Sequence, residues 1–122
     1  WLRQQGIRTG IASSNGIELV ETVLKAQGIQ EYLESVHTCC EVPKGKPAPD
    51  IYLLVAKTLG VTPEECLVFE DVPMGILAGK NAGMRVCAVE DTFSASQREE
   101  KKELADYYIE SYDEIPRERM QP

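Results

Sequence analysis

Positive charge, long apolar runs and paired cysteine motifs are all scarce in this sequence of 122 residues. Lysine and arginine number 13, against 20 aspartate and glutamate residues, which gives a formal net charge of −7. That balance argues against binding to nucleic acid or to an anionic membrane, because both need basic surfaces. No apolar run approaches the roughly 18 residues of a membrane-spanning helix, and no signal peptide is visible.

The cysteines and the single histidine offer no metal or catalytic motif. Cys39, Cys40, Cys66 and Cys87 form no C-x-x-C pair and do not meet zinc spacing. Cys66 and Cys87 lie in apolar strand-like runs, so we expect small buried residues in a reducing cytosol and a cytoplasmic protein. His37 is predicted to lie in or at the end of a strand without a role, because no nearby residue orients it.

The rest of the composition indicates one globular domain. A chain of this length buries roughly 65–70% of its unfolded surface, and a hydrophobic fraction of 43% is ordinary. Residues 1–6 indicate the end of a helix, and further helices are predicted at 17–27, 50–59, 73–82 and 97–104. Strands are predicted at 7–12, 35–38, 66–69, 85–89 and 107–109. Strands and helices alternating in this way predict an α/β fold with a parallel sheet.

The first segment with chemical character joins a predicted strand to a helix. It contains Ser13, Ser14 and Asn15. In open α/β sheets, ligands bind beyond the carboxyl ends of the strands, and hydroxyls with free amides at a helix N-terminus suit an anion. The alternative is that Ser14 or Asn15 only caps the helix.

The second segment holds Lys46 between Gly45 and Pro47, in a stiff loop that leads into a helix. A compact ammonium group at this place can neutralise phosphate oxygens. The alternative is a solvated surface lysine, which is the common state of this residue type. Lys44 competes for the same role, but it lacks the Pro-x-Pro-Asp continuation.

The third segment, Glu70-Asp71, is the strongest single signal. Two adjacent carboxylates end a hydrophobic strand, where isolated charges are costly to bury. Mg²⁺ offsets that cost, and it is typically held by one or two carboxylates with substrate oxygens and waters. Asp71 can instead cap the next helix, and both roles are compatible.

The three segments, in this order and spacing, resemble the haloacid dehalogenase (HAD) superfamily of aspartyl phosphohydrolases, and specifically its β-phosphoglucomutase-like phosphatase group. Ser13 matches the second motif of that family, and Lys46, within Gly-Lys-Pro-Ala-Pro-Asp, matches the third. Glu70-Asp71, followed by Gly75-Ile76, matches the fourth. The resemblance covers about residues 6–114. It implies a Rossmann-like parallel sheet with helices on both faces.

The resemblance also implies an activity. The intact protein is expected to be a Mg²⁺-dependent phosphatase or phosphoglucomutase that acts on a small phosphorylated metabolite, expected to be a sugar phosphate, through an aspartyl-phosphate intermediate. Ser13 and Lys46 are the implied catalytic residues. The implied phosphate ligands are Ser13, Ser14, Asn15 and Lys46, and the implied metal ligands are Glu70 and Asp71.

One part of the family pattern is missing from these 122 residues. The first motif, Asp-x-Asp-x-Thr/Val, whose first aspartate is the family's nucleophile, does not occur, and neither does the helical cap that selects the substrate. We therefore expect residues 1–122 to form a single partial core domain, truncated at the N-terminus and inactive alone. Its partner is then either the missing N-terminal segment or another copy of itself. The alternative is a non-catalytic phosphate-binding or interaction module that has lost its nucleophile.

Overall fold

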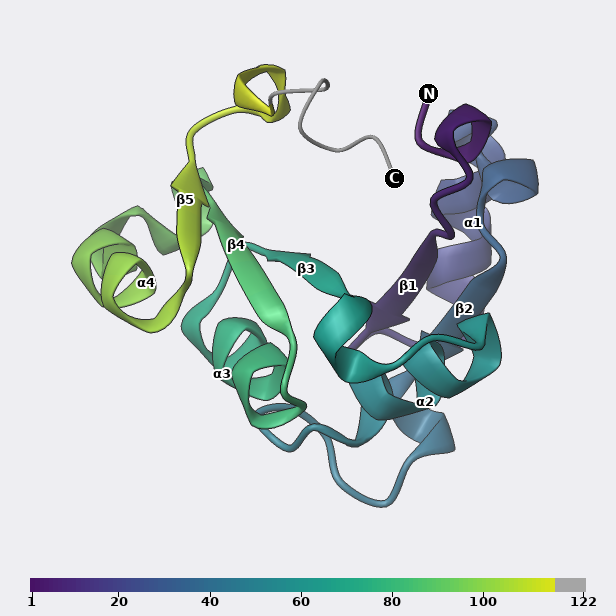
Figure 1. Ribbon diagram of the computed structural model, residues 1–122, viewed down its shortest axis with the longest axis horizontal. Coiled ribbons are helices and arrows are strands. Elements are labelled where there is room, and N and C mark those ends of the chain that lie inside the picture. The colour runs from purple at the N-terminus through teal and green to yellow at the C-terminus, as the bar shows by residue number, and fades with distance from the viewer. Residues whose placement is uncertain (116–122) are drawn as a thin grey trace.

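The computed structural model describes residues 1–115, which form an α/β structure (Figure 1). The described strands are β1 (Gly10–Ser13), β2 (Ser35–Thr38), β3 (Leu67–Glu70), β4 (Arg85–Val89) and β5 (Tyr107–Ile109). The described α-helices are α1 (Ile17–Gln27), α2 (Asp50–Leu59), α3 (Pro73–Asn81) and α4 (Arg98–Leu104). All strand pairs are parallel, as the alternation of strands and helices predicts.

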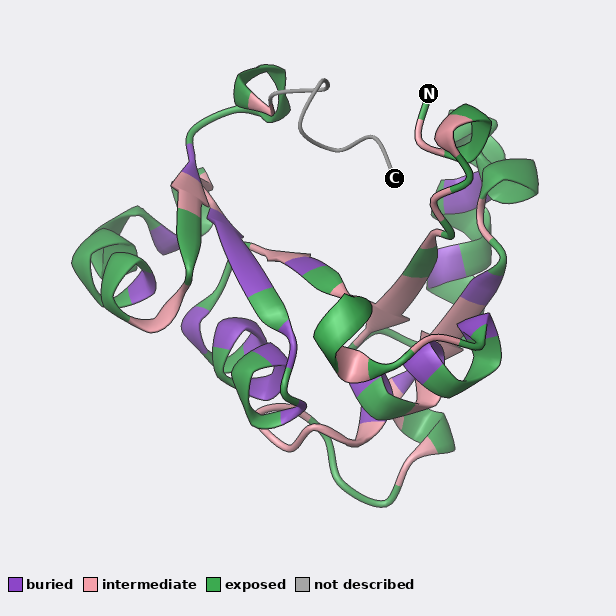
Figure 2. Cartoon of the chain, viewed as in Figure 1, coloured by how far each residue is buried: buried purple, intermediate pink, exposed green. Residues whose placement is uncertain are grey.

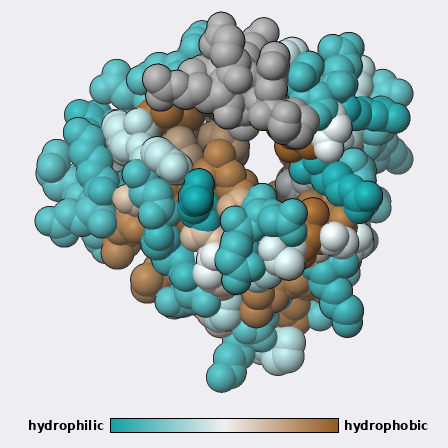
Figure 3. Space-filling model, in the orientation of Figure 1, coloured by the Kyte–Doolittle hydropathy of each residue, from teal (hydrophilic) through white to brown (hydrophobic). Residues whose placement is uncertain are grey.

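The strands form two sheets instead of the single sheet that we expected. One sheet pairs β1 with β2, and the other has the order β3-β4-β5. Within residues 1–115 no strand pairs with β1 on the side away from β2, or with β3 on the side away from β4. The two sheets therefore face each other across an opening (Figure 1), and the space-filling view is hollowed there, with apolar residues visible inside (Figure 3).

Glycines end the two longest helices at the predicted positions. Gly28 and Gly60 have φ angles of 66° and 72°, and the amide of each returns to carbonyls in the last helical turn. Such left-handed caps cost glycine little because it has no Cβ. The predicted helix end at residues 1–6 is only a 3-10 turn, Arg3–Gln5, capped by Gly6. None of the described helices combines the length and apolar character needed to cross a membrane.

One hydrophobic core connects the two halves of the molecule. α2 packs against β1 and β2, and α3 packs against β3 and β4. Ile51 of α2, Ile76 of α3 and Val86 of β4 are at most 1% exposed and belong to the same cluster (Figure 2). α2 therefore holds the two sheets in a fixed relation although their strands do not pair.

His37 is oriented by two neighbours, which corrects the expectation that nothing positions it. Its Nδ1 lies 2.9 Å from Glu41 Oε1 and its Nε2 lies 2.9 Å from Thr58 Oγ1. The Thr58 hydroxyl also donates to the Leu54 carbonyl at 2.9 Å, so it accepts from His37 and is not activated as a nucleophile. The bond to His37 is the main cause that lowers the pKa of Glu41. The cluster ties β2 to α2 and is structural.

Asp106 ties β4 to α3 just before β5, and this arrangement predicts acid sensitivity. Its carboxylate accepts from Lys80 Nζ at 2.7 and 2.8 Å and from the Val86 amide at 2.8 Å. These bonds, that of Lys80 first, lower the pKa of Asp106 below its ordinary value of 3.8. A carboxyl group with a lowered pKa in the fold adds stability that is present above the unfolded pKa and lost as pH falls through the folded pKa.

We therefore expect Asp106→Asn to lower Tm at neutral pH, and the difference from the wild type to shrink at about pH 2. Thermal unfolding at both pH values measures this. Glu103→Gln, which changes an exposed carboxylate on α4, serves as the control and should leave Tm nearly unchanged. A Tm difference for Asp106→Asn that is equally large in acid would contradict the linkage.

Candidate active site

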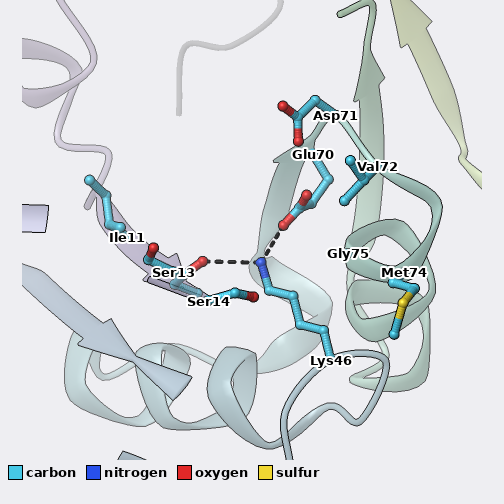
Figure 4. A pocket seen from close by; sticks show the side chains of 10 residues that line it. Ile11, Ser13, Ser14, Lys46, Glu70, Asp71, Val72, Met74 and Gly75 are labelled. Atoms are coloured by element: carbon cyan, nitrogen blue, oxygen red, sulfur yellow. Dashed lines mark hydrogen bonds and ion pairs between the residues drawn. The ribbon is translucent and has the colours of Figure 1, made fainter. Parts of the chain in front are cut away.

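The carboxyl ends of β1 and β3 and the loop before α2 surround one cavity of about 450 Å³. Ser13 and Ser14 line it from the end of β1, Lys46 from the loop, and Glu70 and Asp71 from the end of β3 (Figure 4). The three segments that the sequence singled out therefore meet, although β1 and β3 belong to different sheets. Their chemical roles stay predictions.

Lys46 is not a surface lysine. Its side chain is only 12% exposed, and its Nζ donates to Glu70 Oε1 at 2.5 Å and to the Ala12 carbonyl at 3.2 Å (Figure 4). The ammonium group thus bridges the ends of β3 and β1. The loop is anchored from behind by Asn81, whose side-chain amide donates to the Pro47 carbonyl at 3.0 Å. The structure therefore rejects the alternative of a solvated lysine.

The turn after β1 is organised around Ser13. Its Oγ accepts the Asn15 amide at 3.0 Å, and the Cys39 thiol donates to the Ser14 carbonyl at 2.9 Å. α1 has Gly16 as its N-cap and no side-chain cap, so neither Ser14 nor Asn15 serves merely to cap the helix. Ser13 and Ser14 line the cavity, whereas Asn15 does not, and its amide is engaged by Ser13 instead of being free.

Glu70 is held by two neighbours, Lys46 and Tyr52, and a glycine leaves room for its carboxylate. Its Oε1 accepts from Lys46 and, at 2.5 Å, from the Tyr52 hydroxyl of α2. Burial, and next the charge of Glu70, raise the pKa of Tyr52, so its hydroxyl stays a donor. Gly75 of α3 leaves the space that the Glu70 carboxylate occupies, since a Cβ there would lie 2.2 Å from it. Nothing in the sequence around Tyr52 predicts its contact with Glu70.

Asp71 presents a carboxylate that accepts no hydrogen bond and forms no ion pair within residues 1–115. The N-cap of α3 is Val72, without any side-chain cap, so Asp71 does not cap the helix. Its backbone carbonyl accepts from the Ser94 hydroxyl at 2.6 Å. The carboxylate is therefore available to a ligand in the cavity that it lines.

The donor set fits a hard cation. Glu70 and Asp71 supply carboxylate oxygens, which Mg²⁺ prefers, and one oxygen of Glu70 already accepts from Lys46 and Tyr52. Among the described residues no group of three or more histidine, cysteine, aspartate or glutamate side chains is placed to hold a metal. This part of the chain thus offers two carboxylates, and Mg²⁺ commonly takes its remaining ligands from waters and substrate.

Comparison with known proteins places this chain in a family. The sequence model of the haloacid dehalogenase-like hydrolase family matches residues 1–83. Hexitol phosphatase A of Escherichia coli (strain K12) is 41% identical over 88 residues, which cover 72% of this chain and 40% of that protein. The matched part of the chain spans only 38–44% of the length of five curated relatives, including this one.

Solved structures agree with the fold. The CbbY protein of Rhodobacter sphaeroides, crystallised as a mutant in complex with xylulose-(1,5)bisphosphate, superposes with a TM-score of 0.85 at 30% identity, over 94% of this chain and 51% of that one. β-Phosphoglucomutase of Clostridium difficile has a TM-score of 0.81 at 26% identity, over 98% of this chain and 50% of that one.

Proposed function

Because this chain belongs to the haloacid dehalogenase-like hydrolase family, we propose that it carries the phosphate-binding and metal-binding part of a Mg²⁺-dependent phosphatase or phosphoglucomutase. The observation that carries the proposal is the convergence of Ser13, Lys46, Glu70 and Asp71 on one cavity. A family match alone would support the fold but not the chemistry.

Each side chain has a distinct part in this proposal. Lys46 neutralises the phosphoryl oxygens, and Ser13 and Ser14 donate hydroxyl hydrogen bonds to the same group. Glu70 and Asp71 would hold Mg²⁺, which when bound would supply positive charge to the site. Asn15 contributes by fixing the Ser13 hydroxyl through its amide.

The proposed substrate is a small phosphorylated metabolite, and a sugar phosphate is favoured. Hexitol phosphatase A and a protein crystallised with xylulose-(1,5)bisphosphate are both similar to this chain. Phosphatase and mutase chemistry share these residues, because they differ in whether water or a sugar hydroxyl accepts the phosphoryl group.

We also propose that the nucleophile is an aspartate from another polypeptide segment, which forms the aspartyl-phosphate intermediate. Its strand would lie between β1 and β3, whose facing edges carry no partner strand within residues 1–115. A carboxylate at the end of such a strand would lie beside Lys46, which already bridges the two edges. Residues 1–122 are then one partial core domain.

Lysine substitutions test the phosphate site directly. Lys46→Met should weaken binding of inorganic phosphate about 10- to 100-fold, because it removes a charge-assisted hydrogen bond worth about 1.5–3 kcal/mol. Lys44→Met removes the same charge two residues earlier and should change the affinity less than about twofold, because exposed charges interact weakly. Isothermal titration calorimetry with inorganic phosphate measures the affinity of both variants. Equal losses would mean that the loop attracts phosphate only through its net charge.

The chain alone should not hydrolyse a generic phosphate ester in the presence of Mg²⁺. In the proposed roles Ser13 and Lys46 bind the phosphoryl group and Glu70 and Asp71 bind Mg²⁺, so none of them serves as the acceptor. The measurement is release of inorganic phosphate by the purified chain, with Asp71→Ala as the control. Robust turnover that Asp71→Ala abolishes would show that the nucleophile lies within these residues. Phosphate binding without turnover, even when an Asp-x-Asp strand is supplied, would favour the non-catalytic module.

A further inference from the structure

Lys101 is the most unusual buried group outside the cavity. It lies on the polar helix α4, yet it is 0% exposed, whereas lysine is almost never fully buried without a charged partner. Within residues 1–115 it forms no ion pair. Its Nζ instead donates to the Val89 carbonyl at 2.6 Å and to Ser94 Oγ at 2.9 Å.

The bonds of Lys101 have only one possible direction. An ammonium group donates and cannot accept, so the Ser94 oxygen must accept from Lys101. The single hydroxyl proton of Ser94 is then free to point elsewhere, and it is donated to the Asp71 carbonyl at 2.6 Å. Ser94 is itself only 2% exposed, so water does not compete for these bonds.

The chain of bonds ends at the turn that carries the carboxylates. The Asp71 peptide lies between β3 and the first residue of α3, Pro73. Among the described residues no side chain or amide bonds to the Asp71 carboxylate, so the bond to its backbone carbonyl is the contact that can fix this residue. Groups behind a metal ligand often set its direction, and their loss typically costs about 10- to 100-fold in metal affinity.

We propose that Lys101 is a positioning residue: through Ser94 it fixes the Asp71 carbonyl and thereby directs the Asp71 carboxylate into the cavity. The proposal rests on the proposed function, because it assigns Lys101 to the same metal site. Lys101 would affect metal binding in two opposite ways. Its bonds order the turn and favour metal binding, whereas its positive charge opposes a cation nearby.

Nuclear magnetic resonance can follow the Asp71 carbonyl without any metal, in the complex of the chain with an unlabelled peptide whose apolar run ends in Asp-x-Asp. Asp71-Val72 is the only Asp-Val pair in the sequence, so labelling aspartate with carbonyl ¹³C and valine with ¹⁵N gives one cross-peak from this peptide. Ser94→Ala should move the carbonyl resonance upfield because the hydrogen bond is lost. Lys101→Met, which keeps the volume of the side chain, should move it in the same direction. Lys102→Met, which changes the exposed neighbour, should not.

The same peak then follows a titration with Mg²⁺ alone. Ser94→Ala should raise the dissociation constant about tenfold. Lys101→Met should raise it by less, because loss of its positive charge favours the cation. The double variant should be no worse than Ser94→Ala, because both changes break one chain of bonds. An unmoved carbonyl peak in Lys101→Met would overturn the proposal. The proposal would also be overturned if Lys101→Met bound Mg²⁺ more tightly than the wild type while Ser94→Ala kept the wild-type affinity. The lysine would then act only through its charge. If Lys101→Met fails to fold, Ser94→Ala alone must give both effects.

Failure of the proposed function gives a different result. A wild-type chain that does not bind Mg²⁺ would remove the metal site of the proposed function, but the carbonyl shifts would still decide whether Lys101 acts through Ser94.

Discussion

The purified chain is expected to associate with itself or to unfold without a sharp transition, because the facing edges of β1 and β3 have no partner strand within residues 1–115. Unpaired edges bind other chains. A buried backbone group that lacks its partner costs about 1–3 kcal/mol, whereas a whole domain is stable by only roughly 5–15 kcal/mol. A few unsatisfied backbone groups in the opening between the sheets would therefore cancel much of the free energy of unfolding.

Sedimentation at several concentrations, together with thermal unfolding, measures this. The expected result is concentration-dependent association and a broad transition. Adding a peptide with an apolar run that ends in Asp-x-Asp should convert the chain to a stable complex of one chain and one peptide, and a scrambled peptide of the same composition should not. A monomer with a sharp cooperative transition and no added strand would contradict the expectation.

Gly75→Ala should strongly weaken Mg²⁺ binding, by about tenfold or more, because Glu70 must move. A Cβ at this position would lie 2.2 Å from Glu70 Cδ and Oε2, well inside contact distance. Glu70 has little freedom to yield, because Lys46 and Tyr52 both hold its other oxygen. We also expect a loss of stability of about 1–3 kcal/mol, as for other overpacked sites.

Two other glycines separate the site effect from a general loss of stability. A Cβ at Gly79 would lie 2.6 Å from Val86 Cγ2 in the core, so Gly79→Ala should lower Tm without touching Glu70. Gly16→Ala enters open space and should leave the Mg²⁺ affinity unchanged, whereas Tm should fall slightly because alanine is a poorer N-cap residue for α1 than glycine. Calorimetric titration with Mg²⁺ and thermal unfolding of all three variants make the comparison. Wild-type affinity in Gly75→Ala would show that the position of Glu70 is not needed for Mg²⁺.

Short-range patterns in the sequence were enough to predict most of the elements. α1 (Ile17–Gln27), α2 (Asp50–Leu59) and β4 (Arg85–Val89) begin and end where the apolar spacing places them. The reason is local: an apolar stripe at helical spacing followed by Gly28 or Gly60 is a complete helix signal within a dozen residues. The bounds of β1 shift from residues 7–12 to Gly10–Ser13, because strand ends depend on a partner.

The sequence also predicted that the three segments meet at one cavity, but it could not choose between two roles for each of them. From its segment alone Lys46 was expected to be solvated, and Asp71 could have capped α3. Exposure and capping decide these alternatives, and both depend on residues far away in the chain. Lys46 is covered because it reaches Glu70 and Ala12, and Asp71 is left free because Val72 takes the N-cap position.

Only the tertiary structure could assign Tyr52 and Lys101. Within α2, Tyr52 is one more residue of an apolar face, and within α4, Lys101 is one more charge on a polar helix. Their hydrogen bonds to Glu70 and Ser94 form only after packing brings separate elements together. The division into two sheets has the same origin. Apolar runs specify that strands form, whereas the pairing of strand edges depends on which strand lies next to them.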